Sequence, residues 1–378
     1  MAERENTTTH FYPREPMRFE ASNIDDLLVY CQKLEASDIT IQTGEPIIVE
    51  VYGRIYKITK RLLTNTEVGD LLNALYGPNG TTQLMRGTDL DTHYEVRPSR
   101  GERYRYRING VACYVEGHEG IQITIRNIPS LPPSLASLHF PQPIIDAMAP
   151  QEGVVYVTGA TGSGKSTLLA SIIKTLAEEQ NSNRKILTYE APIEFVFDSV
   201  SKPSAVIAQS EIPKHLPTFA AGVRNALRRK PHVILVGEAR DPETINAVID
   251  AALTGHPVYT TLHTNGVAET IRRLVGSFAQ EERAGRTIDI IETLRLIVWQ
   301  RLVPSVDGKR IALREYLVFS EALRDRLLDS DPENITHTTR ELLVEQGQPM
   351  LADVEAKYKE KLISDRWYQI LTARLKHT

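Results

Sequence analysis

The sequence predicts an α/β protein in which a small α+β domain precedes a larger core built on a parallel sheet. Apolar and polar residues alternate with period two in several segments between residues 38 and 126, which favours a mostly antiparallel sheet with helices on one side. Prolines then cluster from Pro129 to Pro150. From Gly153 onward, apolar strands alternate with helical segments, which is the pattern of a parallel sheet.

Within the first domain, the pattern predicts elements that support this fold class. Residues 1–20 are expected to form a flexible arm, and residues 21–128 the α+β domain. The spacing predicts helices over 24–34 and 65–76, strands over 38–42, 103–109 and 121–126, and a hairpin of 47–52 and 54–58 around Gly53.

A boundary between domains is predicted at residues 129–150, because prolines at this density stiffen a connection and prevent strand pairing. The alternative is a proline-rich loop inside one domain. Residues 151–320 are expected to form the core domain, and residues 321–378 a charged helical extension. The predicted core strands are 154–158, 185–189, 233–236 and 258–262, with 296–302 and 311–318 as further strands of the same sheet.

Composition indicates a soluble globular protein. The 378 residues are 41% hydrophobic and 24% charged, which suits two domains with buried cores. The net charge of −4 disfavours direct nucleic-acid binding, for which a basic domain is typical. Cys31 and Cys113 lack the spacing of a metal site and indicate free thiols in a reducing compartment. No apolar run approaches the roughly 18 residues of a membrane span, so membrane association is expected through partners only.

A glycine-rich segment, Gly159–Ser166, lies between the first predicted core strand and a predicted helix over 167–176, and it fits the phosphate-binding pattern Gly-x4-Gly-Lys-Ser. Glycines permit positive φ, so that backbone N–H groups can approach phosphate oxygens next to a helix N-terminus. We expect Lys165 to reach the β- and γ-phosphates of ATP, Ser166 to bind Mg²⁺ and Thr167 to contact the α-phosphate. The expected nucleotide-binding residues of this loop are Gly159, Thr161, Gly162, Ser163, Gly164, Lys165, Ser166 and Thr167.

Carboxylates follow two further core strands. The strand 233–236 ends in Gly237-Glu238, where nucleotide-hydrolysing proteins place an acid beside Mg²⁺ and the attacking water. Because Glu stands where Asp is usual, Glu238 is expected to act through metal-bound water or by polarising the nucleophile. The alternative for Glu238 is a helix-capping acid. Glu190 and Glu194 follow the strand 185–189, at a position suited to the Mg²⁺ shell and to water activation.

Two histidines bracket the predicted strand 258–262. His256 precedes this strand and His263 follows it. A histidine near a γ-phosphate can donate a hydrogen bond to it, whereas a metal site would need a cysteine or third histidine at suitable spacing. The alternative for each histidine is a structural hydrogen bond.

In order and spacing, these four blocks resemble the Walker A, Asp box, Walker B and His box of the secretion ATPase superfamily, which includes pilus motors and the type II and type IV secretion ATPases. Upstream, the segments Ala36–Ile41, Arg105–Asn109 and Arg126–Pro129 resemble further motifs of the superfamily. The Glu-Ala-Pro box at 190–192, the short N-terminus and the charged C-terminal tail are most similar to the DotB/TraJ-like ATPases of type IVB (Dot/Icm and IncI-type conjugation) systems.

The resemblance implies a PAS-like N-terminal α+β domain, a RecA-like P-loop NTPase core and a helical C-terminal extension. It further implies a homo-hexameric motor that hydrolyses ATP as its two domains close. Such a motor would work in the cytoplasm, recruited to the inner membrane by inner-membrane and cytoplasmic secretion-system components. We expect the C-terminal extension to bind partner proteins.

The resemblance also implies roles for individual residues. It assigns catalysis to Glu190, Glu194, Glu238, His256 and His263. It implies that some of the arginines Arg105, Arg107 and Arg126 reach the nucleotide phosphates when the domains close. The alternative for each arginine is a solvated strand face.

Two residues depart from the superfamily pattern. Ala191 and His232 each stand where Asp is usual, and the loss of a carboxylate at Ala191 alters the expected Mg²⁺ shell. The four-cysteine zinc module of many type II secretion ATPases does not occur, which disfavours that subfamily. The rival functions are a type IV pilus retraction motor, a nucleic-acid motor and a nucleotide-binding scaffold without hydrolysis.

Overall fold

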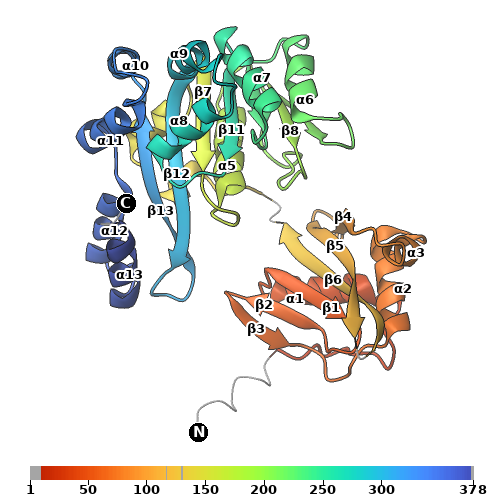
Figure 1. The fold of residues 1–378 in the computed structure, drawn as a ribbon. Coiled ribbons are helices and arrows are strands. Elements are labelled where there is room, and N and C mark those ends of the chain that lie inside the picture. Colours follow the sequence, from red (N-terminus) through yellow and green to blue (C-terminus); the bar gives the residue numbers. More distant parts are fainter. Residues whose placement is uncertain (1–9, 116, 129–130, 376–378) are drawn as a thin grey trace. The chain divides into compact units, whose positions relative to one another are not determined.

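The computed structural model describes residues 10–115, 117–128 and 131–375 and divides the chain into two compact units (Figure 1). The first unit comprises Met1–Ser130 and the second Leu131–Thr378. Each unit has a buried apolar core of its own. The expected α/β fold class, with a smaller mixed domain before a larger one, is confirmed.

The first unit is built on an antiparallel sheet with the strand order β3-β2-β1-β6-β5-β4. Alternate residues are buried, so Ile39 and Ile41 of β1 share a core with Ile123 and Ile125 of β6. The strands are β1 (Asp38–Gln42), β2 (Ile48–Val51), β3 (Arg54–Lys57), β4 (Leu90–Val96), β5 (Tyr104–Val115) and β6 (His118–Ile128).

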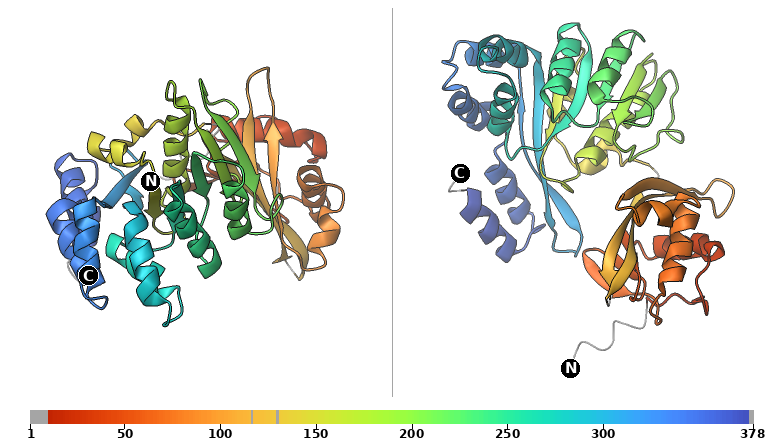
Figure 2. Two further views of the ribbon diagram at one scale, coloured as in Figure 1. Left: turned by 90° about the horizontal axis from the view of Figure 1, so that it is seen from above. Right: turned by 45° about the vertical axis from the view of Figure 1, so that its right-hand side comes forward.

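Helices α1 (Ile24–Lys33) and α2 (Asn65–Tyr76), with the short α3 (Gly80–Leu84), pack on the apolar face of this sheet and leave the other face polar (Figure 2). Helix α2 begins with a capping box. The Glu67 carboxylate accepts the backbone N–H of Thr64 at 2.9 Å, and the Thr64 hydroxyl accepts that of Glu67 at 3.3 Å.

Residues 10–20, expected to belong to a flexible arm, are packed onto the first unit. The side chains of Tyr12 and Phe19 are buried in its core. The backbone N–H of Tyr12 donates to the Ile58 carbonyl at 2.7 Å, and that of Phe19 donates to the Glu67 carboxylate at 2.8 Å. The expectation is therefore corrected for this part of the arm, because the two aromatic rings bury large apolar surfaces. Residues 1–9 lie outside the described residues.

The second unit is built on a sheet with the strand order β13-β12-β7-β11-β10-β8-β9, in which β12 to β9 run parallel and β13 pairs antiparallel with β12 (Figure 1). The expected core strands are all present, and β9 was not predicted. The strands are β7 (Gly153–Thr158), β8 (Lys185–Glu190), β9 (Val206–Glu211), β10 (Val233–Val236), β11 (Pro257–Leu262), β12 (Leu294–Pro304) and β13 (Arg310–Val318).

Helices cover both faces of this sheet (Figure 2), which explains why its central strands β7 and β11 are buried along their whole length. Along β7, Val154 and Tyr156 pack with α6 to α9, whereas Val155 and Val157 pack with α5. The helices are α5 (Lys165–Glu178), α6 (Phe219–Leu227), α7 (Pro242–Leu253), α8 (Val267–Gly276) and α9 (Arg283–Thr293).

Most of the expected linker, 129–150, belongs to the second unit. A 3-10 turn at Leu135–Leu138 and the short helix α4 (Gln142–Ala147) bring Phe140 and Ile144 into the apolar cluster beside α5. The boundary between the units lies at Ser130, so the prolines stiffen a segment that covers the core. Residues 129 and 130 themselves lie outside the described residues.

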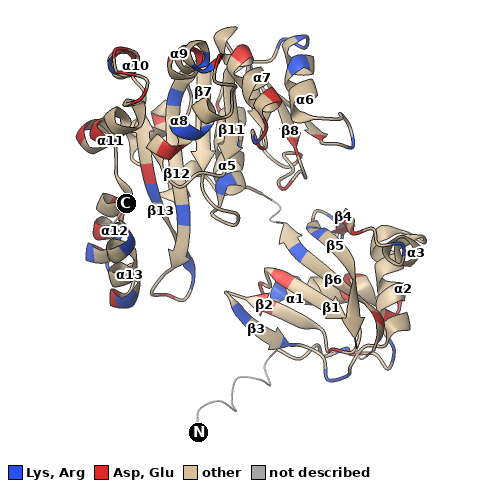
Figure 3. Ribbon diagram, in the orientation of Figure 1, with Lys and Arg blue, Asp and Glu red and all other residues tan. Residues whose placement is uncertain are grey.

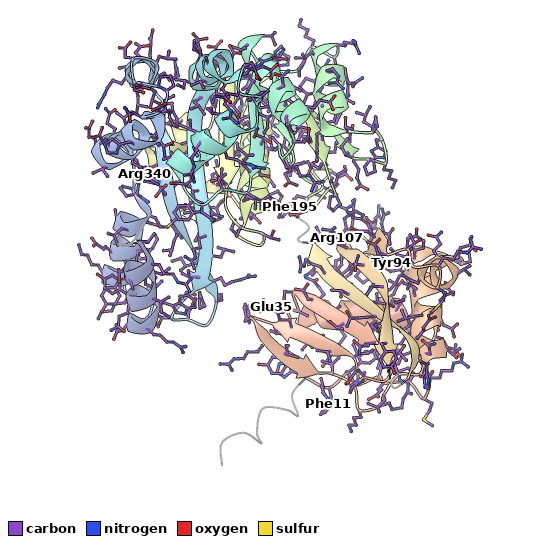
Figure 4. All side chains as sticks on the ribbon, in the orientation of Figure 1. Phe11, Glu35, Tyr94, Arg107, Phe195 and Arg340 are labelled. Atoms are coloured by element: carbon purple, nitrogen blue, oxygen red, sulfur yellow. The ribbon has the colours of Figure 1, made fainter. Side chains whose placement is uncertain are left out.

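The C-terminal extension is helical, as expected, and it is integral to the second unit. Leu323 and Leu342 join the core cluster of α7, while Val354 and Leu371 pack with Leu313 of β13. Arg340 of α11 pairs with Glu269 of α8 at 2.6 Å (Figure 4). Removing the extension would therefore expose apolar core. Its helices are α10 (Glu321–Leu328), α11 (Ile335–Gln346), α12 (Met350–Lys359) and α13 (Asp365–Leu375).

Candidate functional site

The glycine-rich loop lies between β7 and α5, as the sequence predicts. Gly159, Gly162 and Gly164 all have positive φ, at 142°, 75° and 84°. Residues with a Cβ rarely adopt this conformation, so the glycines set the curvature of the loop. Because α5 begins at Lys165, the loop lies against the N-terminus of a 14-residue helix, where a phosphate is stabilised by backbone N–H groups.

The Lys165 side chain bends back over this loop. Its Nζ donates to the carbonyl oxygens of Gly159 and Ala160 at 2.8 and 2.9 Å. Burial lowers the pKa of Lys165, and the nearby carboxylates of Glu238 and Glu194 oppose that shift. The ammonium group is therefore partly desolvated, which strengthens its attraction for an anionic ligand such as a phosphate.

A cavity of about 210 Å³ opens beside the loop at the carboxyl ends of the parallel strands. Ligands in open α/β sheets bind at this edge. The Phe195 ring, labelled in Figure 4, forms part of the wall. The polar and acidic residues of the lining are Thr161, Lys165, Ser166, Glu190, Glu194, Glu238, Thr261 and His263.

Glu238 follows β10 and faces this cavity. Its Oε1 lies 3.2 Å from Nε2 of His263, and its Oε2 lies 3.8 Å from Nη1 of Arg240. The Thr261 hydroxyl donates to the Gly237 carbonyl at 2.7 Å, which ties the end of β11 to the residue before Glu238. The carboxylate is therefore held in place by groups from two neighbouring strand ends.

Glu190 is held by a residue that sequence analysis missed. Its Oε1 accepts the Thr188 hydroxyl at 2.6 Å and Nε2 of Gln209 at 3.1 Å. Gln209 lies on β9, and the same Nε2 donates to the Phe195 carbonyl at 2.9 Å. The alternation of residues 206–211 is weak, since Val206 is exposed and the other five are only half-buried. Strand β9 is therefore recognised from its parallel pairing with β8 in the folded structure, and not from its sequence pattern.

The remaining loop residues divide between two sides. Gly162 and Thr161 line the 210 Å³ cavity, whereas Gly164 and Thr167 line a neighbouring hollow of about 1090 Å³ between α5, β12, β13 and α12. Ser163 is buried beneath the loop. Together with Ala160, Ser163 also lines a third hollow of about 580 Å³, so the loop borders several concave surfaces.

His256 does not lie at this cavity. It precedes β11, at the amino edge of the sheet, and its Nδ1 lies 3.2 Å from the Ala251 carbonyl and 3.1 Å from the Thr254 hydroxyl. These contacts close the end of α7, so the structural alternative fits His256, whereas His263 lies in the cavity. The length of β11 separates the two rings.

The expected arginines lie on the polar face of the first unit's sheet. Arg107 of β5 is paired in register with Arg126 of β6, and Arg105 lies two residues from Arg107 on the same face. Arg107 contacts Asp91 at 2.6 Å, and Arg126 contacts Asp38 at 2.8 Å. Figure 3 shows basic and acidic residues side by side on these strands, and Figure 4 labels Arg107.

Across residues 10–115, 117–128 and 131–375, no group of three or more His, Cys, Asp or Glu side chains could hold a metal ion unaided. Mg²⁺ commonly takes one or two protein ligands and completes its shell with water and phosphate oxygens. Ser166 and Glu238 both line the cavity and are groups of this kind. Together with Lys165, they fit a nucleotide accompanied by Mg²⁺.

Comparison with known proteins identifies the family. The model of the family "Type II/IV secretion system protein" matches residues 101–345. The chain belongs to this family. It is 33% identical over 303 residues to the type IV pilus retraction ATPase PilT of Pseudomonas aeruginosa, covering 80% of this chain and 84% of PilT. It is 32% identical to the uncharacterized protein YggR of Escherichia coli, covering 83% of this chain and 92% of YggR.

Solved structures agree with this assignment. The X-ray structure of the Legionella pneumophila ATPase DotB matches with a TM-score of 0.91 and 62% identity, covering 96% of this chain and 99% of DotB. DotB of Yersinia pseudotuberculosis matches with a TM-score of 0.88 and 34% identity, covering 95% and 96%. PilT with bound ADP matches with a TM-score of 0.77 and 31% identity, covering 91% and 95%.

The resemblance to the secretion ATPases, and to DotB among them, is thereby confirmed. The expected two-domain organisation with a RecA-like core is confirmed as well. Among the helices of the described residues, none is both long enough and apolar enough to span a membrane.

Proposed function

We propose that the chain is the ATP-hydrolysing motor of a type IVB secretion or conjugation system. The observation that carries this proposal is the 62% identity to DotB, sustained over 96% of the chain. Membership in the secretion ATPase family and the intact phosphate loop make the chain an ATPase. The substrates that such a motor moves would be proteins or pilus components.

The cavity residues have distinct roles in this proposal. Lys165 binds the terminal phosphates, and Ser166 contributes a hydroxyl to the Mg²⁺ shell. Bound Mg²⁺ supplies positive charge against the phosphates. Glu238 acts through water, and Glu194 and Glu190 orient the attacking water, a function for which their position in the cavity wall is suitable.

His263 has a supporting role. Its Nε2 lies 3.2 Å from Glu238 Oε1 and can hold that carboxylate at the cavity by donating its N–H to it. His256 has no catalytic role in this proposal, because it lies at the opposite edge of the sheet.

The active assembly would be a homo-hexamer, and ATP binding would draw the two units of a subunit together. Arg105, Arg107 and Arg126 would then add positive charge at the phosphates, which couples hydrolysis to motion. The ring would work in the cytoplasm and be recruited to the inner membrane by other secretion-system components. The side chains of Arg107 and Arg126 are themselves well exposed in their ion pairs with Asp91 and Asp38, so exchange of partners costs little.

A type IV pilus retraction motor is the second candidate. It is supported by the 33% identity to PilT of Pseudomonas aeruginosa and by the TM-score of 0.77 to PilT with bound ADP. The identity to DotB of Legionella pneumophila is nearly twice as high, so we favour the type IVB motor.

Deletion of the gene separates the two candidates. The type IVB proposal predicts loss of effector delivery or conjugative transfer, with twitching motility unchanged. A plasmid carrying the wild-type chain should restore transfer, and one carrying Glu238→Gln should not. Loss of twitching with normal protein transfer would favour the retraction motor instead.

A further inference from the structure

The phosphate loop rests on one buried side chain of β12, Gln300. This side chain is 4% exposed, and its Nε2 donates to the Ser163 carbonyl at 2.7 Å. A Cβ at Gly159 would lie 2.3 Å from the Gln300 carbonyl oxygen, and a Cβ at Gly164 would lie 2.8 Å from Gln300 Nε2. Residue 300 therefore contacts the loop at its start, its middle and its end.

The contact with Ser163 controls a backbone donor. In a trans peptide, the carbonyl of one residue and the N–H of the next point in opposite directions. When Gln300 holds the Ser163 carbonyl, the N–H of Gly164 is directed away from Gln300, and so away from β12. Backbone N–H groups of such a loop bind phosphate oxygens, so this hydrogen bond orients one of them before the nucleotide arrives.

Arg314 fixes the Gln300 amide from the other side. It lies opposite Gln300 on β13, and its Nε donates to Gln300 Oε1 at 2.9 Å. Because a guanidinium only donates, the amide cannot be turned over without losing both of its hydrogen bonds. Arg314 is 7% exposed, packs its guanidinium 3.9 Å from the centre of the Phe140 ring and donates to the Leu138 carbonyl at 2.6 Å.

The chain of contacts continues into the C-terminal extension. The backbone N–H of Arg314 donates to Oδ2 of Asp353 on α12 at 2.8 Å. The next residue, Glu315, accepts the backbone N–H of Met350, the first residue of α12, at 3.2 Å. Helix α12 is thus bound to the segment of β13 that holds Gln300. In a buried network of this kind, each polar group that loses its partner costs free energy.

We propose that Gln300 and Arg314 are positioning residues of the phosphate loop and that α12, through Asp353, holds them in place. Nucleotide affinity then depends on the attachment of α12, about 190 residues along the chain from the loop. By linkage, bound nucleotide strengthens the attachment of α12 in return. The inference concerns the ATP site alone and does not depend on which secretion or pilus system the motor serves.

The variant Gln300→Glu tests the contact with the loop. Its carboxylate retains the interaction with Arg314 but cannot donate to the Ser163 carbonyl. We expect the Kd for a fluorescent ADP analogue with Mg²⁺ to rise about tenfold, a loss equivalent to one buried hydrogen bond. The melting temperature without nucleotide should fall moderately, because the Ser163 carbonyl loses its buried donor, and the rise in melting temperature on adding Mg-ADP should shrink.

A set of variants on α12 tests the connection to the extension. Asp353→Ala removes the acceptor of the Arg314 N–H and should raise the Kd for the ADP analogue about threefold. Asp353→Asn retains an acceptor oxygen and should restore the wild-type Kd. The exposed Glu355 lies on the same helix, so Glu355→Ala is the matched control and should leave the Kd unchanged.

A purely structural role gives a different pattern. If Gln300→Glu and Asp353→Ala lower the melting temperature but bind the ADP analogue as the wild type does, the proposal is overturned. If Gln300→Glu does not fold, the comparison of Asp353→Ala with Asp353→Asn decides alone: equal Kd values overturn the connection, and a selective loss in the alanine variant supports it.

Discussion

Both edges of the parallel sheet carry lysine and histidine side chains, but these side chains differ in what they contact. At the carboxyl edge, Lys165, Glu238 and His263 face a common cavity of about 210 Å³. At the amino edge, a hollow of about 290 Å³ includes His232 and His256 and has no carboxylate in its lining within the described part of the chain.

The polar side chains at the amino edge form hydrogen bonds with backbone groups. Nδ1 of His232 accepts the Lys185 N–H at 3.1 Å, Lys185 Nζ donates to the Arg229 carbonyl at 3.0 Å, and His256 closes the end of α7. In this sheet, polar side chains at the carboxyl ends of the strands line the cavity, whereas those at the amino ends form hydrogen bonds to the backbone. Parallel strands direct their carboxyl ends, with the loops that follow, toward the ligand. Matched substitutions at the two edges test this difference.

The largest expected effect comes from the two lysines. Lys165→Ala removes the ammonium group of the cavity and should raise the Kd for Mg-ADP at least about a hundredfold. Lys185→Ala removes a lysine of the amino edge whose ammonium donates to the Arg229 carbonyl, and it should leave the Kd within about twofold. Titration with a fluorescent nucleotide measures both. Similar losses in the two variants would remove the distinction between the edges.

The glutamates Glu194 and Glu152 form the second pair. Glu194→Gln preserves shape but removes a carboxylate of the cavity, and kcat for ATP should fall about a hundredfold with a smaller change in KM. Glu152, which precedes β7, is exposed and pairs with Arg295 at 2.9 Å. Glu152→Gln should change neither kcat nor stability beyond a few tenths of a kcal/mol. Steady-state phosphate release is the assay, and an unchanged kcat in Glu194→Gln would contradict the site assignment.

The histidines are expected to separate activity from stability. His263→Gln should lower kcat about tenfold, because it disturbs the contact with Glu238. His256→Gln should leave kcat unchanged and cost about 1 kcal/mol of unfolding free energy through the lost contact at the end of α7. Turnover and denaturant unfolding are measured on both proteins. A tenfold fall in kcat for His256→Gln would restore the catalytic role that the family resemblance implies.

The smallest effect is expected from the two departures from the family pattern. Ala191→Asp adds a carboxylate to the cavity wall and should lower the Mg²⁺ concentration for half-maximal turnover about threefold. The neutral Ala191→Asn is the control for size. His232→Asp makes the corresponding change at the amino edge and should leave the Mg²⁺ dependence as it is. Equal Mg²⁺ curves for Ala191→Asp and wild type would show that the cavity does not need the missing carboxylate.

Local pattern predicted most of the fold. The apolar strands of the core, the loop at Gly159–Ser166 and the helical extension are encoded in neighbouring residues, so they are visible in the sequence. The packing of residues 10–20 and 131–150 was not predicted, because both segments are rich in prolines or charges. Only a few buried side chains, such as Phe19 and Phe140, anchor each segment to its unit. Burial of this kind depends on the tertiary fold, which local pattern does not report.

The site was predicted in part, for the same reason. Lys165, Glu238 and His263 follow strands, so their meeting at one edge is a consequence of topology. His256 precedes β11, which places it at the amino edge of the parallel sheet, whereas the family resemblance implies a catalytic role at the carboxyl edge. Gln300 and Arg314 match no motif. Arg314 binds Gln300 across two neighbouring strands, and Gln300 binds Ser163 far upstream in the chain, and contacts between residues so distant in sequence leave no local pattern.

The most direct test of the site is ATP turnover by Glu238→Gln, measured together with its affinity for Mg-ADP. Glutamine preserves the size of the side chain but cannot polarise water as a carboxylate does. We predict a fall in kcat of at least about a hundredfold, with the Kd for Mg-ADP within about threefold of the wild type. Turnover equal to that of the wild type would contradict the assignment of hydrolysis to the carboxyl edge of this sheet.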